Sequence, residues 1–150
     1  MQAKEREDGE TAVETAESGE SYLIFSIHGE RWAFKTTLVR EIIHSAKIHP
    51  LPFVPDYIEG VVNCHGVPHT VVNPLKMSGT SGAEIAGGTV LVLKRDDDEC
   101  ALKISNIEFF FEPEPTEIKP DGILYKKDLI PYFDADKIES RLLEDLVEEN

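Results

Sequence analysis

The sequence predicts an all-β domain of the barrel or sandwich class that ends in one α-helix. Short runs rich in β-branched and aromatic residues recur along the chain, and turns rich in Gly and Pro separate them. Only the last segment has the spacing of an amphipathic helix. At 150 residues, the chain is expected to form one globular domain with a buried core.

The first part of this domain is predicted to hold three strands and a long loop. Residues 21–28 ("SYLIFSIH") and 31–36 ("RWAFKT") suggest a hairpin around a tight turn at Gly29–Glu30. Residues 38–44 ("LVREIIH") are too few for periodicity to decide between helix and strand, and two adjacent isoleucines favour a strand. Three prolines interrupt residues 50–60, so we expect a loop there that ends in a short turn.

The same pattern predicts the remaining strands. Two strands that flank Cys64–Val67 are expected to form a hairpin, and a mobile loop follows at "SGTSGAEIAGG". A second hairpin surrounds "DDDE", one more strand contains "FFF", and a last pair surrounds "KKD". The strands are expected at residues 60–63, 68–73, 89–95, 100–104, 107–112, 123–125 and 129–133.

Residues 134–150 are predicted to form an acidic amphipathic helix. Ile138, Leu142 and Leu146 recur at a spacing of four residues and place one apolar stripe on the helix. Asp136 and Glu139 fit a start that resembles a capping box.

The net charge of −14 excludes a typical nucleic-acid binder, which needs clustered Lys and Arg. Residues 1–20 hold seven acidic and two basic side chains, and we expect them to be a disordered arm. Residues 134–150 have the same charge balance. The acidic ends are open to two interpretations: steering toward a basic partner, or solvated tails.

The expected location is the cytoplasm. No apolar run approaches the roughly 18–20 residues of a membrane helix, so no direct membrane insertion is predicted, and the N-terminal segment lacks the apolar core of a signal peptide. Two cysteines are too few for a disulfide framework and are expected to be free thiols.

Cys64, His65 and His69 are the residues that most resemble a reactive site. In an extended strand His65 and His69 lie roughly 13 Å apart, which is too far for two ligands of one zinc ion. The pattern also contains no orienting group for a Cys/His nucleophile, no nucleophile turn and no phosphate-binding glycine loop. The residues therefore predict no metal, no cofactor and no enzymatic activity.

The order of features from residue 21 to residue 138 resembles the CheW-like chemotaxis coupling protein family. Residues 22–43 are similar to the family's opening hairpin and its Val-x-Glu-Ile segment, here Val39 to Ile42. "LPFVPDYIEGVVNCHG" resembles its Leu-Pro, Pro-x-Tyr-Ile-x-Gly-Val-x-Asn-x-Arg-Gly signature. The resemblance implies two small five-stranded β-barrel subdomains that share a core.

The resemblance also implies an adaptor without enzymatic activity. Such an adaptor binds the cytoplasmic tip of methyl-accepting chemoreceptors and the regulatory domain of the histidine kinase CheA. The family's receptor-binding groove carries over to Val39, Glu41, Gly60 and His65. Asn63 and Gly66 are expected to shape the hairpin beside them.

Three positions depart from the family pattern. His65 stands in place of an Arg, and Asn73 and Ser105 each stand in place of an Asp. The second half is also short enough to lack a strand. Two hypotheses remain: a divergent coupling protein with a changed partner choice, or a CheW-like module that serves another scaffold or kinase pathway. Phe110 or its neighbours are second-choice interface residues, because one strand face cannot bury three consecutive rings.

Overall fold

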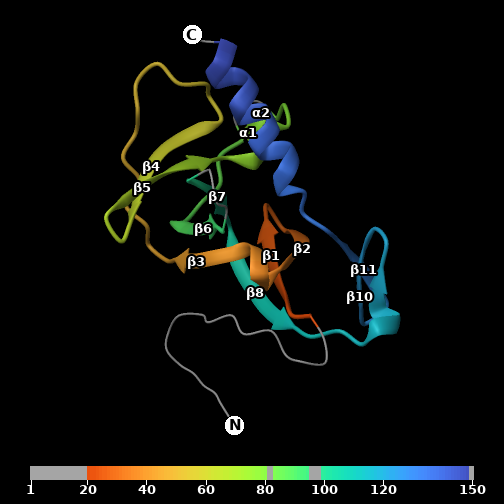
Figure 1. The fold of residues 1–150 in the computed structure, drawn as a ribbon. Helices are drawn as coiled ribbons and strands as arrows, with labels where there is room; N and C mark the ends of the chain where they lie inside the picture. The colour runs from red at the N-terminus through yellow and green to blue at the C-terminus, as the bar shows by residue number, and fades with distance from the viewer. Residues whose placement is uncertain (1–19, 81–82, 95–98, 149–150) are drawn as a thin grey trace.

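The computed structural model describes residues 20–80, 83–94 and 99–148, so the predicted arm at 1–20 lies outside the described residues except for Glu20. The described chain is mostly strand and ends in a helix, as predicted (Figure 1). The strands are β1 (Tyr22–Ile27), β2 (Glu30–Lys35), β3 (Val39–Ile43), β4 (Ile58–Cys64), β5 (Val67–Val72), β6 (Thr89–Leu93), β7 (Cys100–Ile104), β8 (Asn106–Phe111), β9 (Ile118–Lys119), β10 (Gly122–Tyr125) and β11 (Asp128–Pro131). The helices are α1 (Pro74–Met77) and α2 (Ala135–Glu148).

One half of the domain is a five-stranded sheet in the order β3-β6-β7-β5-β4. Its neighbours are antiparallel except for β5 and β7, which pair in parallel. The chain that follows β3 brings His49 against Val61 of β4, where two backbone hydrogen bonds of 2.8 and 2.9 Å form. The two edge strands of the sheet therefore approach one another, as in a closed barrel.

The other half contains two three-stranded sheets, β2-β1-β8 and β11-β10-β9. A parallel bridge between Ala33 and Tyr132, with a hydrogen bond from Phe133 N to Ala33 O of 2.9 Å, joins them. In Figure 1, β10 and β11 lie on the opposite side of β1 from β4 and β5. The segment after Phe111 is short, but this half does not lack a strand there, because β9, β10 and β11 all form.

Three hairpins turn through two residues that both have positive φ. They are His28–Gly29, His65–Gly66 and Lys126–Lys127. Positive φ at both central residues is the type I′ geometry that matches strand twist. The predicted turn at Gly29–Glu30 is one residue too late, because His28 adopts a φ of 51° and Glu30 already pairs with Ile27.

A shared core connects the two halves. Its largest cluster takes residues from β1 and β2 in one half, from β6 and β7 in the other, and from α2, including Leu23, Phe25, Leu91, Leu102 and Ile138. Two smaller clusters lie in the five-stranded half and between β1 and the β10–β11 hairpin. The apolar side chains of α2 therefore fix the helix to both halves at once.

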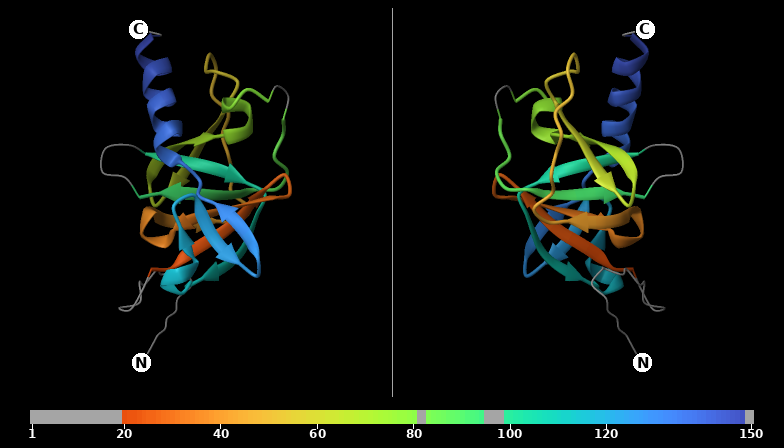
Figure 2. Two further views of the ribbon diagram at one scale, coloured as in Figure 1. Left: turned by 90° about the vertical axis from the view of Figure 1, so that its right-hand side faces the viewer. Right: turned by 90° about the vertical axis from the view of Figure 1, so that its left-hand side faces the viewer.

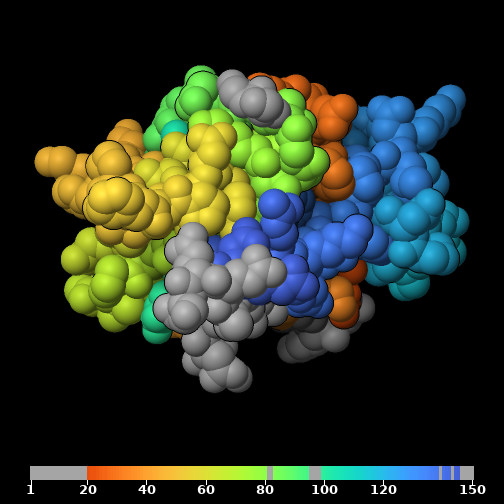
Figure 3. Space-filling view, turned by 90° about the horizontal axis from the view of Figure 1, so that it is seen from above, coloured from red at the N-terminus to blue at the C-terminus, as the bar shows by residue number. Residues whose placement is uncertain are grey.

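The N-cap of the C-terminal helix lies two residues before Asp136, where the capping-box pattern predicts the start. Asp134 Oδ1 accepts hydrogen bonds from the backbone amides of Asp136 (3.1 Å) and Lys137 (3.3 Å), so Asp134 is the N-cap and Asp136 lies in the first turn. Ile138 and Leu142 are buried as the stripe requires. Figure 2 shows α2 rising from the sheets, and Figure 3, viewed onto that end, shows it between residues 50–60 and the β10–β11 hairpin. Among the described helices, none is long and apolar enough to cross a membrane.

Candidate functional site

The β4–β5 hairpin presents the candidate residues Asn63, His65 and Gly66 at one end of the five-stranded sheet. His65 (φ 54°) and Gly66 (φ 87°) form its turn, and the Asn63 side chain accepts a hydrogen bond of 2.7 Å from Gly66 N. This side-chain contact mimics a backbone turn and fixes the loop locally. Asn63 and Gly66 therefore act on the shape of the hairpin, in agreement with the expectation for them.

Glu41 and His65 form the most direct contact between candidate residues. His65 Nε2 lies 2.7 Å from Glu41 Oε1, and the two side chains are 77% and 35% exposed. Glu41 belongs to β3 and His65 follows β4, which are the opposite edges of the sheet. Closure of the barrel brings the two residues together across 24 positions of sequence.

A β-bulge in β3 lies between Val39 and the half-buried Glu41. The pairing register of β3 with β6 shifts between Val39 and Glu41. Val39 and Ile42 both pack against the same core cluster although they are three residues apart, whereas a regular strand would present them on opposite faces. Val39 is itself only 6% exposed, so it supports the strand from the core.

Gly60 packs closely against the backbone of His49 and Pro50. Its φ is +143°, and a Cβ at this position would lie 2.2 Å from the carbonyl oxygen of His49. His49 is the residue that bridges to Val61 and closes the sheet. The structure thus gives Gly60 a role in closing the barrel that brings Glu41 to His65.

Cys64 lies beneath this pair. The residue is 4% exposed, and its Sγ contacts Glu41 Oε1 at 3.6 Å. Burial raises the pKa of the Cys64 thiol, and the nearby Glu41 charge raises it further, so the thiol stays protonated at neutral pH. His69 is not part of this group, because it is buried on β5 with its Nδ1 3.0 Å from Val67 O.

Both of the other departures from the family pattern take part in hydrogen bonds, and those of Asn73 explain why an Asp is absent there. Asn73 is fully buried; its Oδ1 caps α1 through Leu75 N and Lys76 N, and its Nδ2 donates to Ala83 O at 2.9 Å. A carboxylate could not donate to that carbonyl. Ser105 Oγ accepts a hydrogen bond of 3.0 Å from His28 N.

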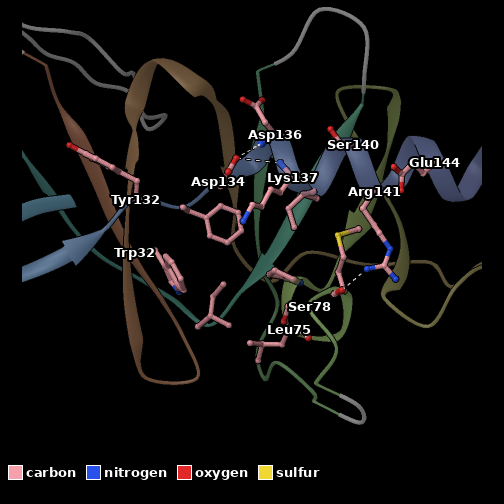
Figure 4. A pocket seen from close by; sticks show the side chains of 15 residues that line it. Trp32, Leu75, Ser78, Tyr132, Asp134, Asp136, Lys137, Ser140, Arg141 and Glu144 are labelled. Carbon is pink, nitrogen blue, oxygen red and sulfur yellow. Dashed lines mark hydrogen bonds between the residues drawn. The ribbon is translucent and has the colours of Figure 1, made fainter. Parts of the chain in front are cut away.

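A separate apolar groove of about 790 Å³ lies between α2, α1 and the β1–β2 hairpin (Figure 4). The ring of Trp32 meets Phe133 edge-on, with centroids 5.6 Å apart, and Arg141 donates to Met77 O at 2.9 Å. None of the six candidate residues lines this groove. Phe110 is 48% exposed, while Phe109 and Phe111 pack on Tyr125, so the "FFF" segment leaves its middle ring outside, as expected.

The chain is similar in sequence and in fold to known proteins. Residues 21–135 match the model of the CheW-like domain family. The chemotaxis protein CheW of Bacillus subtilis (strain 168) is 28% identical over 129 residues, which cover 84% of this chain and 82% of that protein. The crystal structure of the scaffolding protein TtCheW from Thermoanaerobacter tengcongensis is similar in fold, with a TM-score of 0.68 at 15% identity over 77% of this chain and 89% of that chain. Since the family match spans most of the sequence, the chain belongs to the CheW-like domain family.

Proposed function

We propose that this protein is a cytoplasmic, non-enzymatic adaptor that couples the cytoplasmic tip of chemoreceptors to the regulatory domain of the histidine kinase CheA. The observation that carries the proposal is the Glu41–His65 pair, which is exposed at the end of the closed barrel. These two positions correspond to the charged residues of the family's receptor-binding groove. An exposed pair of this kind contributes at most about 1 kcal/mol to stability, so its effect is expected on binding.

His65 favours a second candidate function. An Arg side chain would present up to five donors and a permanent charge, whereas the imidazole of His65 presents one or two donors and is already directed at Glu41. A receptor that depends on the Arg would bind weakly here. The alternative is a CheW-like module that serves a different scaffold or kinase pathway.

The test measures binding of the purified protein to a receptor-tip fragment and, separately, to the CheA regulatory domain from the same genome, at low and at physiological salt. Micromolar binding of the CheA domain supports the adaptor. Failure to bind either partner at both salt concentrations would favour the alternative.

Variants then locate the receptor surface. Glu41→Gln is expected to weaken receptor binding by up to about fivefold, the equivalent of about 1 kcal/mol. His65→Arg is expected to strengthen it, because the guanidinium restores donors and charge. His44→Arg is the matched control, since it adds the same side chain at an exposed histidine outside the pair and should leave binding unchanged. Unchanged or weaker binding of His65→Arg would count against the groove assignment.

A further inference from the structure

Glu41, Cys64 and His65 bring three different metal-binding atoms to one place. The carboxylate oxygen, the thiol sulfur and the imidazole nitrogen all lie within 4.8 Å of one another. Around a tetrahedral zinc ion, such atoms are about 3.4–3.6 Å apart, given zinc–ligand bonds of about 2.0–2.3 Å. The Cys64 Sγ to Glu41 Oε1 distance is already 3.6 Å, and the 2.7 Å contact of Glu41 with His65 needs to open by less than 1 Å.

The backbone holds two of the three ligands independently of any ion. Cys64 is the last residue of β4 and is buried against the interior of the five-stranded half. His65 occupies the left-handed turn position, so its side chain does not continue the strand alternation that would place it opposite Cys64. Asn63, through its bond to Gly66 N, fixes this turn. Only the half-buried side chain of Glu41 and the exposed side chain of His65 have to adjust, which keeps the ordering cost small.

The chemistry of the three atoms selects the ion. One sulfur, one imidazole nitrogen and one carboxylate oxygen suit Zn²⁺, whereas Mg²⁺ and Ca²⁺ prefer oxygen ligands alone. Glu41 and a Cys64 thiolate together carry two negative charges, which a divalent ion neutralises. Burial and the Glu41 charge raise the pKa of the Cys64 thiol and keep it protonated, so zinc has to displace the Cys64 proton. Binding therefore transfers the Cys64 proton to solvent and forms a sulfur–zinc bond.

We propose that Glu41, Cys64 and His65 form a zinc-binding site at the end of the five-stranded barrel, with water in the fourth position. The site itself does not depend on the function proposed above. A consequence that does rest on that function is that zinc and a receptor compete for Glu41 and His65, so zinc should weaken receptor binding.

The test uses the full chain, freed of metal by a chelator, and Co²⁺ as a spectroscopic probe for zinc. One equivalent of Co²⁺ should produce a thiolate-to-cobalt charge-transfer band and the visible bands of tetrahedral cobalt, and Zn²⁺ should abolish both. Cys64→Ser should remove the charge-transfer band, and Glu41→Gln should weaken metal binding about tenfold or more. Cys100→Ala and His44→Gln are the controls, because neither residue belongs to the cluster, and both should bind as the parent does.

Two outcomes would overturn the proposal. One is the absence of both cobalt bands and of any heat of zinc binding in a chain that circular dichroism shows to be folded. The other is zinc binding of equal strength in Glu41→Gln and Cys64→Ser, which would place the ion elsewhere on this acidic chain. Because the spectra need no partner, loss of receptor binding alone cannot be confused with loss of the metal site.

Discussion

Replacing Gly60 with alanine tests whether this position supports the fold or contacts a partner. The new Cβ would lie 2.2 Å from His49 O, 2.7 Å from His49 C and 3.0 Å from Pro50 Cα, all of them backbone atoms that cannot rotate away. The φ of +143° adds strain for any residue with a Cβ. Moving the His49 carbonyl disrupts the two hydrogen bonds that join His49 to Val61.

The expected cost follows from these contacts. Backbone strain of about 1–3 kcal/mol and two hydrogen bonds of about 1 kcal/mol each give a loss of about 3–5 kcal/mol in the free energy of unfolding. A domain of this size loses about 2–4 °C of Tm per kcal/mol, so Tm should fall by about 6–20 °C. Urea unfolding followed by the fluorescence of Trp32, the single tryptophan, measures the loss.

Gly66→Ala is the matched control. Gly66 also has positive φ (87°), but no atom lies within 4 Å of a Cβ built there. Its substitution should cost only about 1–2 kcal/mol of conformational strain. If Gly60→Ala were no less stable than Gly66→Ala, the closure argument would be refuted. A stable Gly60→Ala that loses receptor binding would instead make Gly60 a direct contact.

Three further predictions concern stability. Burial raises the pKa of Tyr22 and of Cys64, so both groups hold their protons more tightly in the folded chain than in the unfolded chain. The free energy of unfolding should therefore be highest below about pH 8.5 and fall as the pH rises above it. A urea midpoint that stays constant from pH 8 to 11 would contradict this. Tyr22→Phe should make the decline less steep. Arg141→Ala removes the hydrogen bond to Met77 O and should speed hydrogen exchange in α2 while costing about 1–2 kcal/mol; unchanged exchange would show that apolar packing alone holds the helix. Phe53 is 97% exposed with a φ of 59°, so Phe53→Asn should be neutral or raise the free energy of unfolding by up to about 1 kcal/mol, and a thermal melt that shows a loss would reveal a contact of the ring.

The strands other than β9 could be predicted because their signals are local. Two adjacent isoleucines in β3 and the glycine at the β4–β5 turn act over a few residues, and the structure confirms both elements. The errors are also local. His28 shows no sequence sign of its positive φ, so the pattern predicts the first turn one residue late. Asp136 has a glutamate at the capping-box spacing, so the pattern favours it over Asp134, which is the N-cap in the structure.

The candidate site could not be predicted to the same extent, because it depends on closure of the barrel. Cys64 and His65 are adjacent in sequence, but Glu41 reaches them from the opposite edge strand. On a flat strand His65 and His69 lie too far apart for one zinc ion. A turn at Gly66 can bring Cys64 and His65 together, but the sequence then offers no further ligand nearby, because Glu41 lies 24 residues before His65.

The six candidate residues divide into two groups, according to whether they support the fold or present atoms at the surface. The first group has a structural role: Val39 is buried, Gly60 lies against the backbone of His49, and Asn63 and Gly66 share the hydrogen bond of the turn. Substitution of these residues is expected to lower the stability of the fold. Glu41 and His65 present exposed atoms, and their substitution is expected to leave stability almost intact. Loss of binding in a residue of the first group is therefore ambiguous unless its unfolding free energy is measured as well. Loss of binding in Glu41→Gln at unchanged stability would identify a contact surface, and that comparison separates a partner's footprint from the framework that presents it.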